Sequence, residues 1–190
     1  MRVSVDGAAV EVAPGATVLE AARAASRWVP TLCFDERQAP FGACRVCLVG
    51  LAGSPGPVPA CTTPCREGME IETEDATARR VAGAVVELVL SELPEPPGPH
   101  TELAAVAARL GVEGSRWSGA VHEREEDLRH PYLALRHQLC ISCGRCVRAC
   151  DVGLDAGFED STCVACGACA DTCPTGAIAE LSLVAQSGEG

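Results

Sequence analysis

The chain has 190 residues, which is enough for one ordinary domain or two small ones. Its formal net charge is −11, which argues against a nucleic-acid partner because phosphates require a basic face. The start of the chain shows no secretory signal, and no apolar stretch is long enough to span a bilayer. The sequence therefore predicts a soluble, cytoplasmic protein.

Two short alternating segments, Arg2–Val5 and Ala9–Val12, are joined by Asp6-Gly7 and predict a β-hairpin. Thr17 and Glu20 then form a capping box ahead of a helix over Val18–Ser26, which is expected to bury its apolar residues on the hairpin. Two later strands are expected over Leu48–Leu51 and Met69–Thr73. A hairpin, a helix, a cysteine loop and later strands suggest a β-grasp ferredoxin domain over residues 1–78.

The first cysteine set lies within this domain and contains four cysteines: Cys33, Cys44, Cys47 and Cys61. Three cysteines on one loop and a fourth on a later segment follow the logic of the plant-type [2Fe–2S] site, although the first gap here is longer. A structural zinc site, or thiols without a shared ligand role, are the alternatives. Cys65 is an extra cysteine and is expected to be a buried free thiol rather than a substitute ligand.

A helix over residues 76–93 is predicted, with Val81, Val85, Leu88 and Val89 on one stripe. A proline-rich turn ends it. A second helix follows over Thr101–Leu110, with Thr101 as its cap and Gly111 as its stop. Residues 112–136 carry mixed charge and are expected to form an irregular connection, so that 79–136 is a helical connector.

Residues 137–190 contain an internal repeat in which a C-x2-C-x2-C-x3-C run recurs 23 residues later. In each run the first three thiolates are expected to bind one [4Fe–4S] cluster, and the fourth cysteine to begin a helical turn and bind the other cluster. This exchange predicts one site from Cys140, Cys143, Cys146 and Cys173. It predicts a second site from Cys150, Cys163, Cys166 and Cys169. The fold class is therefore α+β, with a β-grasp domain, a connector and a C-terminal two-cluster bacterial ferredoxin-like domain.

Thirteen cysteines are far above normal usage, but their odd number and close spacing suit metal centres better than disulfides. A pair of zinc sites is the alternative for the repeat, although full quartets are more than zinc pairs require. The segment between Cys150 and Cys163 is short, so the hairpin expected between the two motifs must be nearly absent.

With both cysteine sets in view, the chain resembles the N-terminal iron–sulfur segments of the complex I large peripheral subunit and of NAD-linked formate dehydrogenases. It also resembles the small diaphorase subunit of NAD-reducing [NiFe] hydrogenases. The matching stretches share the cysteine motifs and their flanks: Pro30–Cys33, Gly42–Cys47, Val58–Pro64, Arg66–Met69, Cys143–Arg148 and Cys173–Ala177. The resemblance implies three clusters and electron relay between a flavin/NAD module and a partner active site.

The chain departs from this family between the two cysteine sets. The family usually has a His-x3-Cys-x2-Cys-x5-Cys site there for another [4Fe–4S] cluster, but Thr101 stands where its last cysteine is expected, and His100 is misplaced to be its histidine. The molybdopterin domain of complete formate dehydrogenase subunits is also missing. The resemblance therefore implies a chain without that fourth cluster, most similar to the hydrogenase diaphorase subunit, with a split formate dehydrogenase as the alternative.

No catalytic constellation is visible, because the four histidines are scattered and are expected to be surface or packing residues. The sequence also has no nicotinamide fingerprint or phosphate-binding glycine loop. We therefore expect an electron-transfer subunit that works with a flavin/NAD-binding diaphorase subunit and a hydrogenase or molybdenum formate dehydrogenase catalytic subunit. A free-standing ferredoxin-type carrier and a zinc-stabilised interaction module are the alternatives.

Overall fold

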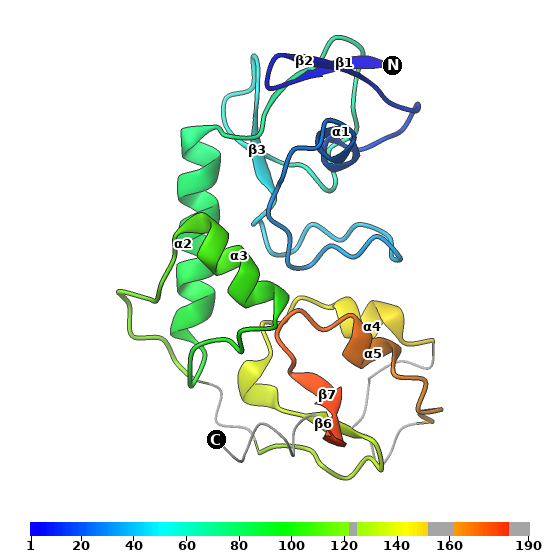
Figure 1. Ribbon diagram of the computed structural model, residues 1–190, viewed down its shortest axis with the longest axis vertical. Helices are drawn as coiled ribbons and strands as arrows, with labels where there is room; N and C mark the ends of the chain where they lie inside the picture. Colours follow the sequence, from blue (N-terminus) through cyan, green and yellow to red (C-terminus); the bar gives the residue numbers. More distant parts are fainter. Residues whose placement is uncertain (122–124, 152–161, 183–190) are drawn as a thin grey trace. The chain divides into compact units, whose positions relative to one another are not determined.

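The computed structural model describes residues 1–121, 125–151 and 162–182 (Figure 1). The chain divides into two compact units. Unit 1 comprises Met1–Glu87 and Val106–Glu113, and unit 2 comprises Leu88–Ala105 and Gly114–Gly190. Among the described residues, no helix has the length and hydrophobicity needed to cross a membrane.

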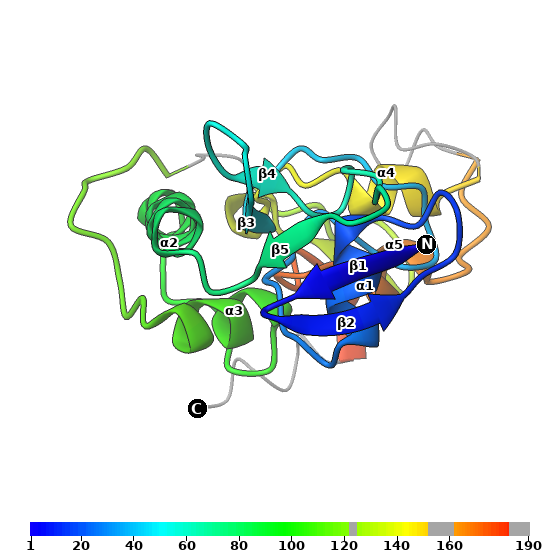
Figure 2. The same ribbon diagram turned by 90° about the horizontal axis from the view of Figure 1, so that it is seen from above.

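Unit 1 is built on a mixed sheet with the strand order β2-β1-β5-β3-β4 (Figure 2). Its strands are β1 (Arg2–Val5), β2 (Ala8–Glu11), β3 (Leu48–Leu51), β4 (Val58–Pro59) and β5 (Glu70–Glu72). Strand β5 pairs in parallel with β1 and antiparallel with β3. The predicted strands are confirmed to within a residue or two, and β4 is an edge strand that the sequence did not predict, consistent with the proline in it.

The hairpin turn and the first helix follow the local signals in the sequence. Asp6 and Gly7 both adopt positive φ, 49° and 82°, which matches the twist of a two-residue hairpin. Helix α1 (Val18–Ala24) has the predicted capping box, because Thr17 accepts from the amide of Glu20 and Glu20 accepts from the amide of Thr17. The helix ends earlier than predicted because Ser26 turns into the left-handed region, with φ 54°.

The core of unit 1 lies between the sheet and α1. Val3 and Val5 of β1 alternate into it, as a strand with one buried face requires. Leu19 of α1 and Ile71 of β5 are almost completely buried against them. Cys65 belongs to this core and is 5% exposed, which confirms the prediction of a buried thiol.

The connector contains helices α2 (Ala76–Ser91) and α3 (Glu102–Leu110), as predicted. The predicted apolar stripe of α2 is wrong, however, since Val81 and Leu88 are exposed. The buried face is instead formed by Ala78, Ala82 and Val86, because small side chains at every fourth position let the helix backbone approach its neighbours.

Helix α3 begins and ends where the sequence predicted. Thr101 caps its start by accepting a hydrogen bond from the amide of Ala104 at 3.2 Å. Gly111 ends it with φ 71°, and the amides of Gly111 and Val112 return to the carbonyls of Ala108 and Ala107. These two bonds form a Schellman motif, which glycine favours because it adopts the left-handed conformation without strain.

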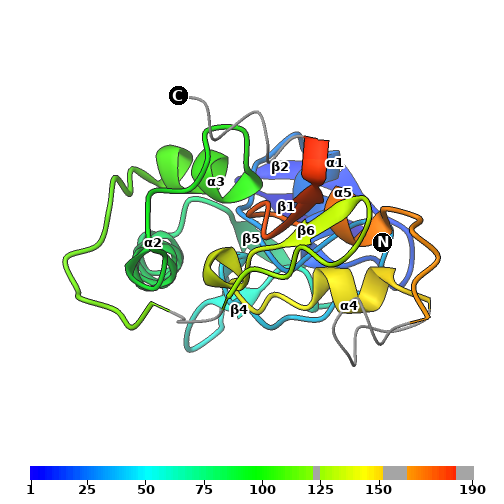
Figure 3. The ribbon, with the colours of Figure 1, turned by 90° about the horizontal axis from the view of Figure 1, so that it is seen from below.

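Unit 2 has little regular structure (Figure 3). A two-stranded sheet pairs β6 (Leu133–Leu135) with β7 (Ile178–Glu180) in antiparallel register. Unit 2 also contains the 3₁₀ turn η1 (His137–Leu139), the short helices α4 (Arg145–Ala149) and α5 (Ala168–Asp171), the end of α2 and the start of α3. Strand β6 lies inside the range predicted to be irregular, so that prediction is wrong for these residues.

Candidate metal centres

The first cysteine set lies on two segments of unit 1. Cys33, Cys44 and Cys47 belong to the loop between α1 and β3, and Cys61 lies two residues after the end of β4. Cys47 and Cys61 are 2% and 0% exposed and are part of the hydrophobic core. The fold of unit 1 therefore brings the two cysteine segments together at one end of its core.

The four thiols of this set form two pairs. The amide of Cys44 donates to Sγ of Cys33 at 3.4 Å, and the Sγ atoms of Cys47 and Cys61 are 3.3 Å apart. Among the described residues, no group of three or more Cys, His, Asp or Glu side chains gathers around a point that would hold a single ion. Two pairs of thiolates suit a [2Fe–2S] group, in which each of two irons takes two cysteine ligands.

Proton sharing within each pair dominates the acid–base behaviour of these cysteines. The hydrogen bond from Cys47 lowers the pKa of Cys61 to about 7. The same bond, followed by burial, raises the pKa of Cys47, and the Cys33 thiol raises the pKa of Cys44 in the same way. One thiol of each pair therefore retains its proton in the absence of a metal, and binding iron must release it.

The backbone of the cysteine loop is shaped to leave amides near the thiols. Arg45, between Cys44 and Cys47, has a positive φ of 56°. Gly42 has φ 69° and a side chain there would reach Cγ2 of Thr62 at 3.0 Å. The amide of Cys44 reaches the sulfur of Cys33 and the amide of Val46 reaches that of Cys44, and turn amides of this kind can face an anion. The loop is therefore suited to surround an anionic cluster.

The repeat in unit 2 has the same backbone in both copies. Ser142 and Gly144 have φ 54° and 70°, and Ala165 and Gly167, each 23 residues later, have φ 55° and 78°. Each glycine precedes a short helix, α4 or α5. The amide of Ala165 donates to Sγ of Cys163 at 3.4 Å. The sequence repeat is thus also a repeat of local conformation.

Several thiols of unit 2 have electrostatic neighbours in the other copy of the repeat. Burial raises the pKa of Cys143 to about 11, and the nearby thiols of Cys173 and Cys146 add to the shift. Burial also raises the pKa of Cys146, with further contributions from Cys173 and Cys140. Cys173, the last cysteine of the second copy, therefore lies near Cys143 and Cys146 of the first copy.

The reciprocal neighbours surround Cys169. Its pKa is raised first by burial and then by the thiols of Cys150 and Cys163. Cys166 is exposed, and the segment predicted to lack a hairpin, residues 152–161, lies outside the described residues. The predicted helical turn at the fourth cysteine is wrong, because Cys150 ends α4 instead of beginning a helix. These groupings suit two four-thiolate sites with one exchanged ligand each.

Two residues near these thiols were not identified from the sequence. His130 is buried, and its Nε2 lies 3.6 Å from Sγ of Cys163. Arg145 is also buried, and its guanidinium contacts both carboxylate oxygens of Glu102 at 2.7 and 3.0 Å. His130 lies 33 residues before Cys163 and outside the cysteine motif, so no local pattern indicates its contact.

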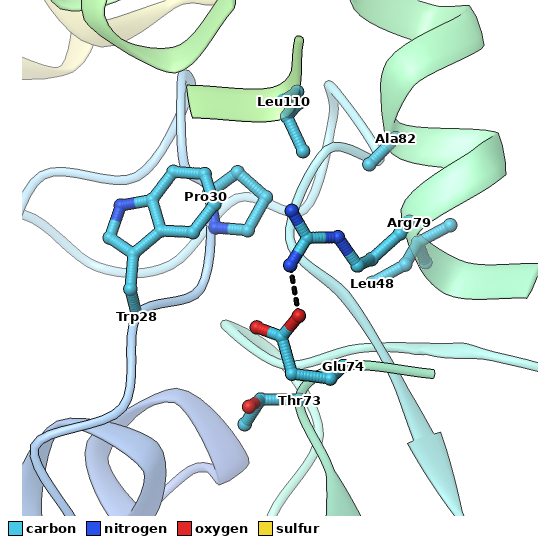
Figure 4. A pocket seen from close by; sticks show the side chains of 8 residues that line it. All are labelled: Trp28, Pro30, Leu48, Thr73, Glu74, Arg79, Ala82 and Leu110. Carbon is cyan, nitrogen blue, oxygen red and sulfur yellow. Dashed lines mark hydrogen bonds and ion pairs between the residues drawn. The ribbon is translucent and has the colours of Figure 1, made fainter. Parts of the chain in front are cut away.

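A small hollow of unit 1 lies apart from the thiols (Figure 4). Trp28 and Pro30 line one side of it, and Arg79 reaches across to form an ion pair with Glu74. No cysteine is among its lining residues. The chemistry of the described residues is therefore concentrated in the cysteine segments.

Two family models match the chain. Residues 1–76 match a 2Fe-2S iron-sulfur cluster binding domain, and residues 157–179 match a 4Fe-4S binding domain. The α+β fold with an N-terminal 2Fe-2S ferredoxin-like domain and a C-terminal 4Fe-4S binding domain is therefore confirmed, and with it a 2Fe-2S cluster and at least one 4Fe-4S cluster.

Comparisons with curated proteins cover most of this chain and extend this result. The chain is 31% identical over 170 residues to a subunit of the NADH-quinone oxidoreductase of Rickettsia felis, covering 84% of this chain and 24% of that protein. It is 32% identical over 166 residues to the mitochondrial NADH dehydrogenase [ubiquinone] iron-sulfur protein 1 of Solanum tuberosum, covering 84% and 22%. The chain thus spans about a quarter of the length of these curated relatives.

A solved structure matches more completely. A chain in the crystal structure of NAD⁺-reducing [NiFe]-hydrogenase in the H2-reduced state superposes with a TM-score of 0.84 and 28% identity. The match covers 95% of this chain and 87% of that one.

Proposed function

Since the chain is an iron–sulfur protein related to the N-terminal part of the large iron–sulfur subunit of complex I and to a chain of NAD⁺-reducing [NiFe]-hydrogenase, we propose that it relays electrons within an NAD-linked oxidoreductase complex. It would connect a flavin/NAD(H)-binding subunit with a partner catalytic subunit, either a hydrogenase or a molybdenum formate dehydrogenase. The near-complete match to a hydrogenase chain supports the hydrogenase first.

The proposal rests on the spacing of the cysteines in the sequence, which assigns all but one of them to three sets of four. The [2Fe–2S] cluster is assigned to Cys33, Cys44, Cys47 and Cys61. The first [4Fe–4S] cluster is assigned to Cys140, Cys143, Cys146 and Cys173. The second is assigned to Cys150, Cys163, Cys166 and Cys169. The two thiol pairs of unit 1 and the crossed neighbours of unit 2 support these assignments.

The clusters would supply one-electron chemistry, and the polypeptide would set their environment. The thiols hold the irons, the left-handed turns direct amides toward the clusters, and burial limits their contact with water. The sequence has no glycine-rich nucleotide fingerprint. The proposal therefore places flavin and NAD(H) on another subunit.

The work is divided along the chain in this proposal. Residues 1–78 carry the [2Fe–2S] site, residues 137–190 carry both [4Fe–4S] sites, and residues 79–136 connect them without a cluster of their own. The connector contains helix α3 and most of helix α2. A cytoplasmic location is part of the proposal, and the thiol form of all thirteen cysteines, without a disulfide, is consistent with it.

The ligand assignment is tested on the full chain, purified without oxygen. About ten irons and matching acid-labile sulfide are expected from one [2Fe–2S] and two [4Fe–4S] clusters. Cys65→Ala is the matched control and should keep them all, because Cys65 is a core thiol outside the three sets. Cys173→Ala should weaken the same electron paramagnetic resonance (EPR) signal as Cys140→Ala, and Cys150→Ala the same signal as Cys166→Ala.

Two outcomes would overturn the proposal. Zinc in place of iron and sulfide would leave only an interaction module. Purification from the native cell tests the partner assignment, since a subunit brings a flavoprotein and a hydrogenase or molybdenum enzyme with it. A chain that elutes alone with its clusters intact would be a free-standing carrier.

A further inference from the structure

The side chain of His130 is buried in unit 2 and held by backbone hydrogen bonds. It is 6% exposed and lies in the turn that leads into β6. Its Nδ1 accepts hydrogen bonds from the amides of Tyr132 at 3.1 Å and Leu133 at 3.0 Å. These bonds fix the orientation of the ring, and the ring of Tyr132 packs edge-on against it with centroids 6.1 Å apart.

The two amides also fix which nitrogen of His130 carries the proton. Both are donors, so Nδ1 must present its lone pair and cannot carry a hydrogen. The neutral imidazole then has its proton on Nε2. That nitrogen is the one that faces Sγ of Cys163, at 3.6 Å. The imidazole is therefore an N–H donor aimed at this sulfur.

We propose that His130 is a positioning and tuning residue for the second [4Fe–4S] cluster, donating an Nε2–H···S hydrogen bond to the thiolate of Cys163. This inference rests on the proposed function, which assigns Cys163 to that cluster. The amide of Ala165 donates to the same sulfur at 3.4 Å, so the sulfur receives two N–H donors. One of them comes from the cysteine loop and the other from the turn before β6.

A hydrogen bond to a cluster thiolate withdraws charge from the sulfur and favours the reduced, more negative state of the cluster. Removing the imidazole donor should therefore make the second cluster harder to reduce. We expect its reduction equilibrium to fall about tenfold, which is a shift of about −59 mV for a one-electron couple. The proposal assigns this effect to one cluster only.

Two variants separate the donor from the structural role of the ring. His130→Asn places an amide oxygen where Nδ1 accepts the two backbone bonds, and it has no donor that reaches Cys163. His130→Gln reaches Cys163 with its amide N–H and leaves the two backbone amides without their acceptor. The matched control is His137→Asn, because His137 lies in the same unit and its backbone carbonyl, not its side chain, contacts Cys140.

The experiment is an EPR-monitored redox titration of the holoprotein, with iron content measured for each variant. The signal of the second cluster is identified as the one altered in Cys166→Ser. His130→Asn should lower its potential, while His130→Gln and His137→Asn should stay close to the wild type. A lowered potential in His130→Gln with none in His130→Asn, or no shift in either, would overturn the inference and leave a packing role for His130.

The proposed function can fail separately. If the wild-type protein lacks the second [4Fe–4S] cluster, both the inference and the three-cluster assignment are overturned. If the cluster is present with full iron content and its potential is the same in His130→Asn, His130→Gln and the wild type, only the inference is overturned.

Discussion

The two cysteine-rich units reach their folds by different means. Unit 1 surrounds its thiols with a continuous apolar core, in which Val5, Leu19 and Ile71 are at most 2% exposed. In unit 2 the described buried cluster around Cys169 contains only Leu133 and Ile178 besides the cysteine. The described helices of unit 2 that carry cysteines are only four or five residues long, too short to be stable without tertiary support.

The difference indicates where the free energy of folding comes from. In unit 1 the burial of apolar side chains drives folding, and the cluster adds to it. In unit 2 the proposed four-thiolate sites would stand in for much of a hydrophobic core, because metal binding is coupled to folding. An ion pair between the buried guanidinium of Arg145 and the half-exposed carboxylate of Glu102 adds a polar contact there.

Removal of the metal should have the largest effect, and it should destabilise unit 2 far more than unit 1. In the full chain stripped of iron and sulfide, the amides of β6 and β7 should exchange with solvent roughly a hundredfold faster or more, because their site no longer contributes folding free energy. The amides of β1 and β3 should retain most of their protection. Hydrogen–deuterium exchange of apo and holo protein measures this, and equal losses in both units would contradict the comparison.

Breaking the Arg145–Glu102 pair should have the next largest effect on stability. Glu102→Ala leaves a guanidinium that is 6% exposed without its carboxylate. Removing one partner of a buried pair costs several kcal/mol, and the half-exposed Glu102 reduces this to about 2 kcal/mol. Anaerobic thermal unfolding should show a midpoint roughly 4–8 °C lower. Glu92→Ala, an exposed carboxylate of the same unit, is the control, and an equal drop there would contradict the role of the pair.

The sequence predicted those features that depend on neighbouring residues alone. The capping box at Thr17, the Asp6-Gly7 turn and the end of α3 at Gly111 all follow from local backbone chemistry. The cysteine repeat is equally local, because its spacing is fixed by the loop around one cluster. Such signals can be read from the sequence because they do not depend on the packing of the rest of the chain.

The features that failed depend on tertiary partners. Strands β6 and β7 are three residues each and find each other across more than forty residues, so neither has a periodic pattern long enough to recognise. The sequence predicts an apolar stripe of α2 that includes Val81 and Leu88, but the buried face is the one with Ala78, Ala82 and Val86, because the packing partners decide which face is buried. The sequence does not indicate the contact of His130 for the same reason, since its partner Cys163 is 33 residues away.

Loss of the capping box of α1 should have the smallest effect on stability, and only unit 1 should be affected. Thr17→Ala removes the side chain that accepts from the amide of Glu20 and should lower the free energy of unfolding by about 1 kcal/mol. Thr77→Ala is the control, because Thr77 is exposed inside α2 and alanine is the better helix former there.

The capping box also makes its contribution depend on pH. The backbone hydrogen bond from Thr17 holds the pKa of Glu20 below its ordinary value. A carboxyl with a lowered pKa stabilises the fold fully above the unfolded pKa, and this contribution is lost as the pH falls through the folded value. The Thr17 hydroxyl also donates to the Glu20 carboxylate and lowers its pKa further, and Thr17→Ala removes this donor while the backbone bond remains. The difference in unfolding free energy between Thr17→Ala and the wild type, followed by circular dichroism, should therefore narrow under acidic conditions. Because the capping box holds no metal ligand, the EPR signals of unit 2 should be the same in both proteins, and a change in them would mean that the two units do not fold by separate means.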